Sequence, residues 1–348
     1  MFYSLYIFLA FKAIEERQLV NTFKKRTQNL LIIFFSLIIG LREEVGCDWD
    51  QYKTIFNSFY DRLNEQWFRL EPSYYMLNSI FSRWEYGFYF VNLVCGVIVS
   101  YCLIKFCENL PRPWLGLCVA YPYFITVVAM GYTRQSVSIS LSLLAFLVLE
   151  KGQFYKSIFY IILGATFHRS GFLFLFAPLL YTFQSTKFSN FIKIILLIPI
   201  SNYFLESFLF PYFIFFRIGY LDQNLSSTGS LIRIILCVIP SFFFIFNFNK
   251  FKLPNITKNI FLTLSIMSIM SLIALRFVPS STAVDRFALN LIPIQILVAS
   301  YVPDIGDLKF DKFSLKFLIV LTVFFVLSVW LIFATHSFCW IPYRNIIF

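Results

Sequence analysis

Long apolar runs dominate the chain, and short polar segments separate them. Most runs are about 15–20 residues long, close to the length that a helix needs to cross a hydrocarbon core. They are continuous rather than alternating, which predicts helices instead of barrel strands. About twelve transmembrane helices are therefore expected in an all-α polytopic membrane protein. The runs fall at residues 1–13, 28–41, 86–104, 113–130, 135–149, 155–167, 171–184, 191–208, 230–247, 258–278, 284–302 and 316–334.

Composition also indicates a membrane protein. Hydrophobic residues make up 59% of the chain, phenylalanine alone contributes 47 residues, and the mean hydropathy is +0.74. A soluble domain of this size could not cover so much apolar surface, so residues 1–348 are expected to form one membrane-embedded domain. The first run lacks the basic region and cleavage site of a signal peptide and is predicted to be a short span.

Lysine is confined almost entirely to one side of the predicted bundle. Excess Lys and Arg in short loops marks the cytoplasmic side, and loop 14–27 contains Lys24, Lys25 and Arg26. With that loop inside, the alternation of spans leaves Lys53 as the one outer lysine among 15. The net charge of +11 is then chiefly an orientation signal, with some attraction to anionic lipid. No soluble basic face is available for nucleic acid.

The outer face is poor in lysine but rich in arginine. Arginine binds phosphate through two parallel hydrogen bonds and keeps its charge in a dry site. Some of these side chains are expected only to reach lipid headgroups. As a group, placed against the positive-inside rule, they indicate an anion-binding face. They are Arg42, Arg62, Arg69, Arg134, Arg169, Arg217, Arg276, Arg286 and Arg344.

A polar stretch at residues 41–52 follows the second run and opens the longest outer loop, 42–85. It holds five acidic or basic residues in a chain that is only 14% charged: Arg42, Glu43, Glu44, Asp48 and Asp50. The loop is also rich in aromatic residues. Aromatic rings and carboxylates together suit a sugar, because rings stack on C–H faces and carboxylates accept hydroxyl hydrogen bonds. An interfacial aromatic belt is the alternative for Trp67, Phe68, Tyr74 and Tyr75, and residues 72–84 are expected to form a half-helix or an interfacial segment.

The acidic residues and the cysteines raise the questions of a metal site and of a disulfide. Asp48 and Asp50 form a D-x-D pair, which can hold a divalent cation on a diphosphate. Arginines can neutralise a diphosphate instead, so no metal and no cofactor are expected. The seven cysteines show no ligand spacing for zinc or an iron–sulfur cluster. Cys47 and Cys339 are both expected outside, where a disulfide between them is one possibility, although sequence alone fixes no pairing.

Other polar groups lie at the outer ends of later runs. Gly131 permits a tight turn, and Thr133 can cap a helix that carries Arg134 and Gln135 in its first turn, where free N–H groups favour anions. His168 and Arg169 lie between two short runs; a structural role for His168 is the alternative.

Two further groups complete the candidate set. Arg276 ends one span and Arg286 begins the next, and charged residues at such depths favour a functional role. Asp285 is expected to pair locally or with another span. Tyr343 belongs to an aromatic C-terminal segment that could close the rim of a cavity.

These motifs together resemble a known family. The chain contains R-x-x-V-G-x-D-x-x-x-Y (Arg42 to Tyr52), E-P (Glu71, Pro72), R-Q (Arg134, Gln135), F-H-x-S (Phe167 to Ser170), D-R-F (Asp285 to Phe287) and P-Y (Pro342, Tyr343), in that order. The set resembles the EpsG family of bacterial polysaccharide polymerases, which overlaps the Wzy O-antigen polymerases. Cys47 departs from the small polar residue usual at its position.

The resemblance implies a GT-C-like, multi-span glycosyltransferase of the bacterial inner membrane. It would join repeat units carried on undecaprenyl pyrophosphate at the periplasmic face, alongside membrane lipid and a chain-length regulator. The reducing-end sugar of the growing chain would move from its lipid diphosphate to a hydroxyl of the incoming unit.

Roles for individual residues follow from that chemistry. A diphosphate is already a good leaving group, so positive charge at the departing oxygens suffices, and a carboxylate is an adequate base if proton transfer is late. Asp48 is expected to be the base, with Glu44 in reserve. Arg42, Arg134, Arg169, Arg276 and Arg286 are expected to bind diphosphate, and Tyr52, Gln135, His168 and Tyr343 to complete the substrate site.

Two other activities stay open from the sequence. A flippase for lipid-linked oligosaccharide would also have many spans and interior cations, although transporters favour mid-membrane charges and related halves. A ligase that transfers finished glycan, or an acyltransferase that uses His168, is the third possibility.

Overall fold

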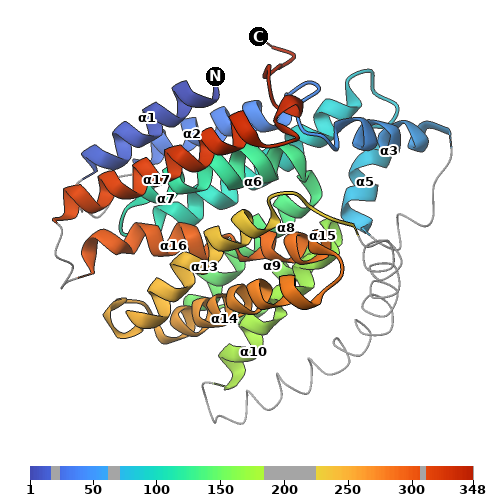
Figure 1. Cartoon of the computed structure of the whole chain (residues 1–348). Helices are drawn as coiled ribbons and strands as arrows, with labels where there is room; N and C mark the ends of the chain where they lie inside the picture. The colour runs from blue at the N-terminus through green and yellow to red at the C-terminus, as the bar shows by residue number, and fades with distance from the viewer. Residues whose placement is uncertain (17–23, 62–70, 184–224, 306–310, 348) are drawn as a thin grey trace.

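The computed structural model describes residues 1–16, 24–61, 71–183, 225–305 and 311–347. Helices account for nearly all regular structure in these ranges, and most run side by side across the view in Figure 1. No β-strand forms among these residues, apart from one isolated antiparallel bridge between Arg42 and Asn345. The all-α prediction is confirmed for this part of the chain.

The helices follow the apolar runs closely. The first half of the chain forms α1 (Phe2–Glu15), α2 (Lys25–Gly40), α3 (Trp49–Asp61), α5 (Pro72–Phe81), α6 (Gly87–Glu108), α7 (Pro113–Ala120), the π-helix η1 (Tyr121–Ala129), α8 (Thr133–Glu150) and α9 (Phe154–Phe167). The second half forms η2 (Arg169–Leu175), α10 (Phe176–Phe183), α13 (Ser230–Phe246), η5 (Phe248–Lys250), α14 (Asn255–Phe277), α15 (Ser281–Ala288), η6 (Leu289–Leu291), α16 (Pro293–Tyr301), η7 (Val302–Asp304), α17 (Lys312–Phe333) and η8 (Ser337–Cys339).

Helices form at every predicted apolar run that falls within the described ranges, and the number of runs that cross the membrane stays a prediction. The run at 191–208 lies outside these ranges, as do Arg62, Arg69, Arg217, Trp67 and Phe68. Residues 72–84 contain the helix α5, as expected. Among the described residues, three helices, α6, α14 and α17, are long and apolar enough to cross a membrane by themselves, and α15 to η7 make a fourth if the 45° bend at Pro293 lies within one span. The described chain is therefore that of a polytopic membrane protein.

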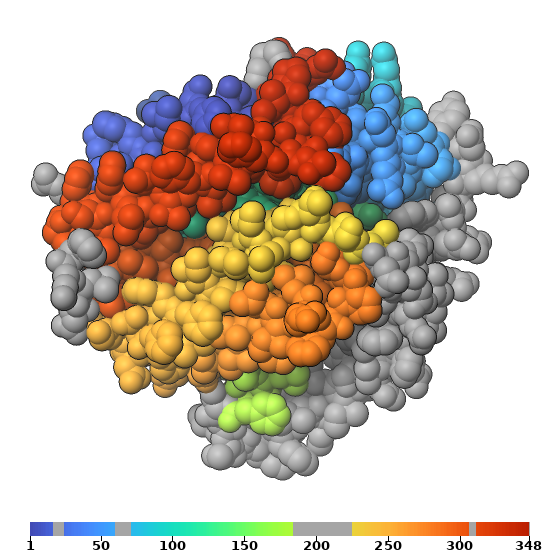
Figure 2. Space-filling model, in the orientation of Figure 1, coloured from blue at the N-terminus to red at the C-terminus, as the bar shows by residue number. Residues whose placement is uncertain are grey.

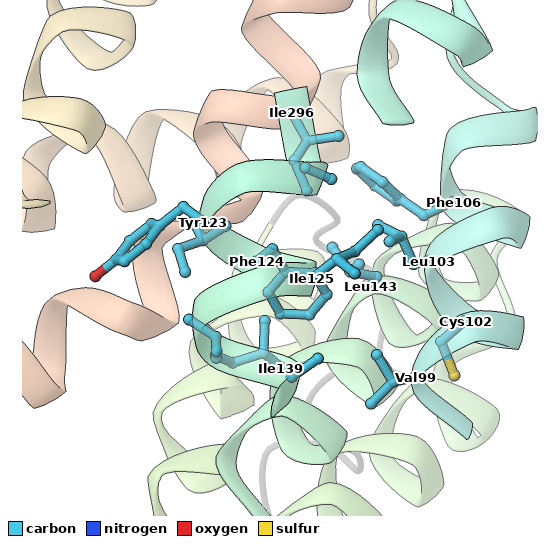
Figure 3. Packing of buried hydrophobic residues seen from close by; sticks show 14 of the residues in the cluster. Val99, Cys102, Leu103, Phe106, Tyr123, Phe124, Ile125, Ile139, Leu143 and Ile296 are labelled. Atoms are coloured by element: carbon cyan, nitrogen blue, oxygen red, sulfur yellow. The ribbon is translucent and has the colours of Figure 1, made fainter. Parts of the chain in front are cut away.

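The core lies where η1 crosses the bundle. Every residue of η1 is buried, and Figure 3 shows Phe124 and Ile125 among side chains from α6, α8 and α16. Tyr123 points away from this cluster, toward ribbons of the C-terminal third. Neighbouring residues of η1 thus contribute to the core on one side and line a cavity, described below, on the other.

Polar contacts gather at the two ends of the bundle. At one end, hydrogen bonds and ion pairs join α2, α5, α8, α13, α15 and the C-terminal segment. At the other end, they join the C-terminus of α1 to α7, η7 and α17, and Glu150 of α8 to Thr257 of α14. The first end collects residues predicted outside, and the second collects residues predicted inside.

A buried ion pair anchors the second end. Arg112 is 2% exposed and bonds Asp304 at 2.7 Å, while the Glu16 side chain accepts from the backbone N–H groups of Trp114 and Leu115 at 3.2 and 3.3 Å. The Glu16 carboxylate thereby satisfies free donors of the first turn of α7. This cluster holds the C-terminus of α1, the start of α7 and η7 together at the end of the bundle opposite Asp48.

We expect Arg112→Met to destabilise the protein by about 3 kcal/mol, because removing one member of a buried pair leaves the other charge uncompensated. The loss of stability should be near the lower end of the range for breaking a buried ion pair, because Lys312 also contacts Asp304, at 2.8 Å. Thermal unfolding in detergent measures the effect. Lys12→Gln is the matched control: it breaks the exposed Lys12–Glu15 pair, 3.2 Å long, and should cost under about 1 kcal/mol. Equal losses of stability in the two variants would contradict a stabilising role for the Arg112–Asp304 pair.

Candidate active site

A cavity of about 740 Å³ opens at the end of the bundle where the residues predicted to lie outside gather. It lies between η1, the start of α13, α15 and α17, and its polar wall includes Asp48, Tyr132, Arg233, Asp285, Arg286 and His336. The rest of the lining is largely apolar and includes Leu236 of α13 and Phe325, Val329 and Phe333 of α17. Figure 2 shows the corresponding furrow between α17 (red) and α13 (yellow), with green atoms at its floor. One space thus joins charged groups to an apolar slot.

Asp48 is held at the cavity by the conformation of the preceding loop. Gly46 has φ +98°, and a Cβ there would collide with the carbonyl oxygen of Met130, so this position requires glycine. The Gly46 N–H donates to Cys339 O at 2.8 Å, and Asp48 O accepts from Tyr52 N at 2.9 Å as α3 begins. The Asp48 side chain remains 30% exposed. The loop therefore presents one carboxylate to the cavity from a fixed backbone.

The electrostatic setting of Asp48 favours a base. Burial raises the pKa of Asp48, while Arg286, Arg134 and His336 act against the rise. A carboxylate with a raised pKa is a better proton acceptor than an ordinary one.

Arg286 lies directly across from Asp48. Its Nη2 is 4.0 Å from Asp48 Oδ2, and its guanidinium stacks 3.8 Å from the centre of the Tyr132 ring. The Arg286 carbonyl accepts from Gln135 Nε2 at 2.9 Å, and Gln135 is only 4% exposed. Gln135 thus fixes the backbone of α15, and Tyr132 supports the charge that faces the cavity.

Arg233 is a cavity residue that the sequence interpretation missed. It donates to Asp285 through Nε at 2.8 Å and Nη2 at 2.7 Å, a bidentate pair between α13 and α15. Ser227 Oγ bonds both partners, at 2.6 Å to Arg233 and 3.1 Å to Asp285. Asp285 therefore pairs with another helix. The available signal was an arginine inside an otherwise apolar run, which favours a functional role by default.

Arg42 and Arg134, both predicted to bind diphosphate, have protein partners in the structure. Arg42 is 1% exposed; it donates to Val45 O at 3.1 Å and Thr133 Oγ1 at 2.8 Å. Arg134 bonds Glu71 and lies 5.3 Å over the ring of Tyr52, itself 5% exposed. Neither arginine lines the cavity. Both sit behind the Asp48 loop, where they support its backbone and its electrostatic field.

His168 lies in a hydrogen-bonded chain behind the cavity. Its Nδ1 is 2.8 Å from Ser170 Oγ, which donates to Asn290 Oδ1 at 2.9 Å. Burial, together with Arg134, Arg169 and Arg286, holds the pKa of His168 well below its ordinary value. The imidazole is therefore neutral at physiological pH and links η2 to η6. Arg169 belongs to the same group of guanidiniums but does not line the cavity.

The remaining predicted site residues lie away from the cavity. Arg276 is exposed at the end of α14. Glu44 is 60% exposed and pairs with Arg344. The Tyr343 hydroxyl donates to Ile38 O at 2.8 Å, so this side chain fastens the C-terminal segment to α2. Asp50 is exposed on the first turn of α3.

Cys47 and Cys339 form a disulfide, which settles a pairing that the sequence left open. It joins the residue before Asp48 to the segment after α17, and both His336 and Trp340 of that segment line the cavity. In the described part of the chain, no three His, Cys, Asp or Glu residues gather as metal ligands.

The arrangement suits transfer of a group away from an anionic carrier. A carboxylate with a raised pKa can accept a proton, and Arg286 faces it across the same space. Aromatic rings of Tyr123, Tyr132 and Trp330 line the cavity and offer faces for a sugar. The adjoining apolar slot suits a hydrocarbon chain.

Comparisons with known proteins identify the family. No curated protein and no solved structure matches the chain. A sequence model of the EpsG family matches residues 25–345, nearly the whole chain, and includes all the residues described at the cavity. The match indicates a membrane protein resembling polysaccharide polymerases, with an activity of the glycosyltransferase type. The chain belongs to the EpsG family.

Proposed function

We propose that the protein polymerises oligosaccharide repeat units carried on undecaprenyl pyrophosphate into O-antigen or a related surface polysaccharide. The cavity that places Asp48 opposite Arg286, beside an apolar slot, is the observation that carries the proposal. A lipid diphosphate sugar needs all three features: a base for the acceptor, positive charge for the diphosphate, and a path for the prenyl chain. The family match supports the polymerase class.

In the proposed reaction, the acceptor hydroxyl of the incoming unit attacks the anomeric carbon of the growing chain. The new glycosidic bond forms as the bond from that carbon to the diphosphate oxygen breaks, and the hydroxyl proton passes to Asp48. Arg286 stabilises the charge that develops on the departing diphosphate. Arg233, already in a bidentate pair with Asp285, holds α15 and so the orientation of Arg286.

Substrate binding is coupled to the strength of the base in this scheme. Arg286 lowers the pKa of Asp48 in the resting structure, across a 4.0 Å ion pair. When the diphosphate draws the Arg286 guanidinium toward itself, Asp48 loses part of that stabilisation and its pKa rises. The carboxylate thus becomes a stronger base when the donor is in place.

We propose an orientation and an architecture together with this function. The cavity faces the periplasm, the lysine-rich end faces the cytoplasm of a bacterial inner membrane, and the chain crosses about twelve times in a GT-C-like arrangement. The lysine asymmetry of the loops supports this orientation. Membrane lipid surrounds the apolar faces, and a chain-length regulator acts on the product; nucleic acid is not a partner, because the basic residues serve orientation.

A deletion strain tests the function directly. We expect its polysaccharide gel to lose the ladder of chain lengths and keep a product with a single repeat. Accumulation of unpolymerised units on the cytoplasmic face would instead indicate a flippase, and normal polymer left on its lipid carrier would indicate a ligase. Either pattern would refute the polymerase assignment.

The pH dependence of polymerisation should show the raised pKa of Asp48. The base must be ionised to accept a proton, so the rate rises with pH as Asp48 loses its own proton. Because burial raises that pKa, the acid limb should lie above the ordinary aspartate value of about 3.9. Initial rates with purified enzyme and lipid-linked donor across a pH series measure it. An acid limb at the ordinary value would contradict the base assignment.

A further inference from the structure

We propose that the Cys47–Cys339 disulfide is a positioning element of the active site, and that its formation activates the enzyme. The inference rests on the proposed function, in which Asp48 is the base. It adds a pair of residues whose covalent state decides whether that base is in place.

Several links join the C-terminal segment to the loop that holds Asp48. Among them, the disulfide reaches the loop residue nearest to Asp48 in the sequence. Three backbone hydrogen bonds fasten that segment to the loop: Glu43 N to Arg344 O at 3.0 Å, Gly46 N to Cys339 O at 2.8 Å, and Ile346 N to Leu41 O at 3.0 Å. All three meet the loop on the N-terminal side of Cys47. The disulfide continues the attachment to the residue that directly precedes Asp48.

The other half of the disulfide is itself firmly held. Trp340 follows Cys339, is 2% exposed and donates from Nε1 to Thr126 O of η1 at 2.7 Å. Its ring also packs against Gly131, where an added Cβ would lie 3.0 Å from the indole. Cys339 is therefore held against η1 through its neighbour Trp340. The disulfide links this fixed position to the Asp48 loop.

The same link sets the electrostatic surroundings of the base. His336, three residues before Cys339, lines the cavity and lowers the pKa of Asp48. Opening the disulfide would free the C-terminal side of the Asp48 loop from the segment that carries His336, while Trp340 and the backbone hydrogen bonds still hold that segment. A displacement of about 1 Å at a reacting group can cost on the order of a hundredfold in rate.

The two cysteines differ from the rest in a way that favours a redox role. The other five, Cys95, Cys102, Cys107, Cys118 and Cys237, are buried free thiols, whereas Cys47 is exposed. Disulfides form and persist in oxidising compartments. The enzyme would therefore be inactive until its site face reaches such a compartment.

The activating step is an ordinary thiol–disulfide exchange. The Cys47 and Cys339 thiols lose two protons and two electrons as the S–S bond forms, and the disulfide of an exported oxidoreductase accepts them and becomes a dithiol. Oxidised glutathione serves as the oxidant in vitro and yields two molecules of reduced glutathione.

Thiol counting tests the covalent state. Alkylation of the denatured wild-type protein, followed by intact mass, should label five cysteines before reduction and seven after it, in line with the seven in the sequence. Seven labels without reduction, in protein purified from membranes under alkylating conditions, would overturn the proposal.

Kinetics test the positioning role. Reduced wild-type enzyme, and the Cys47→Ser/Cys339→Ser double variant, should show kcat lower by about tenfold to a hundredfold. The KM for the lipid-linked donor should change by less than about twofold, because the diphosphate site stays intact. The acid limb should move to higher pH, because the freed Asp48 loop moves away from His336, which lowers the pKa of Asp48. Oxidised glutathione should restore the reduced wild type but not the double variant.

Controls separate this inference from the function itself. Cys95→Ala removes a free thiol and should leave kcat and the response to reduction unchanged. Thermal unfolding and gel filtration should show that the reduced wild type is folded. Reduced enzyme with the kcat and pH profile of the oxidised form would overturn the positioning role while the polymerase function stands. Wild-type oxidised enzyme that makes no polymer would instead overturn the function.

Discussion

Asp48→Asn should reduce polymerisation by about two to four orders of magnitude, the usual effect of removing a general base. The variant keeps the size and hydrogen-bonding shape of the side chain but cannot accept the proton. The KM for the donor should stay within about threefold, because the change leaves the guanidinium groups in place. Incorporation of labelled repeat units into polymer by purified enzyme measures the rate.

Asp50→Asn is the matched control for this substitution. Asp50 lies two residues away, on the exposed face of the first turn of α3, and undergoes the same chemical change. We expect it to retain nearly full activity. Equal losses in both variants would favour the D-x-D metal arrangement that the sequence also permits, and full activity in Asp48→Asn would exclude Asp48 as the base.

Arg286→Lys should lower kcat by about 10- to 100-fold, although the positive charge is kept. Lysine loses the planar, bidentate grip of a guanidinium, and a charge-assisted hydrogen bond contributes about 1.5–3 kcal/mol, or about one to two powers of ten in rate. Arg286→Gln should lower it further. Because Arg286 lowers the pKa of Asp48, the residual activity of Arg286→Gln should also show an acid limb at higher pH. Rate measurements across a pH series read both effects.

Arg276 supplies the control for charge and residue type. It ends α14, is exposed and does not line the cavity. Arg276→Gln should therefore leave kcat within about twofold and the acid limb unmoved. A loss in Arg276→Gln comparable to that in Arg286→Gln would mean that positive charge at this face acts through general attraction of anionic lipid, and not through a defined contact.

The sequence predicted the helices because each depends on local information. A continuous apolar run needs no distant partner to become a helix when every backbone group has to be satisfied within the segment. The stretch that holds Asp48 could be recognised as special from the order of its polar residues alone, whereas the need for glycine at position 46 depends on the distant Met130 carbonyl. The gathering of outer-face residues at one end follows from the alternation of spans.

The different roles of the individual arginines could not be predicted from such local information. Arg42, Arg134 and Arg286 look alike in sequence, each at the end of an apolar run. In the structure, Arg42 is buried against backbone carbonyls, Arg134 pairs with Glu71, and Arg286 faces the cavity. Whether a guanidinium is buried, pairs with a carboxylate or faces the cavity depends on how its helix is rotated and on what packs beside it. Arg233 was missed for the same reason.

By itself the sequence determined a helical membrane chain, with most lysines predicted at one end of the bundle and a group of arginines predicted with Asp48 at the other. These properties follow from hydrophobic run length and charge distribution, which can be read from a few residues at a time. The tertiary structure alone decided that Arg286 faces Asp48, that Arg233 pairs with Asp285, and that Cys47 meets Cys339 across 292 residues of sequence. Such pairings arise when packed helices bring distant segments to one place, and no local pattern encodes that meeting.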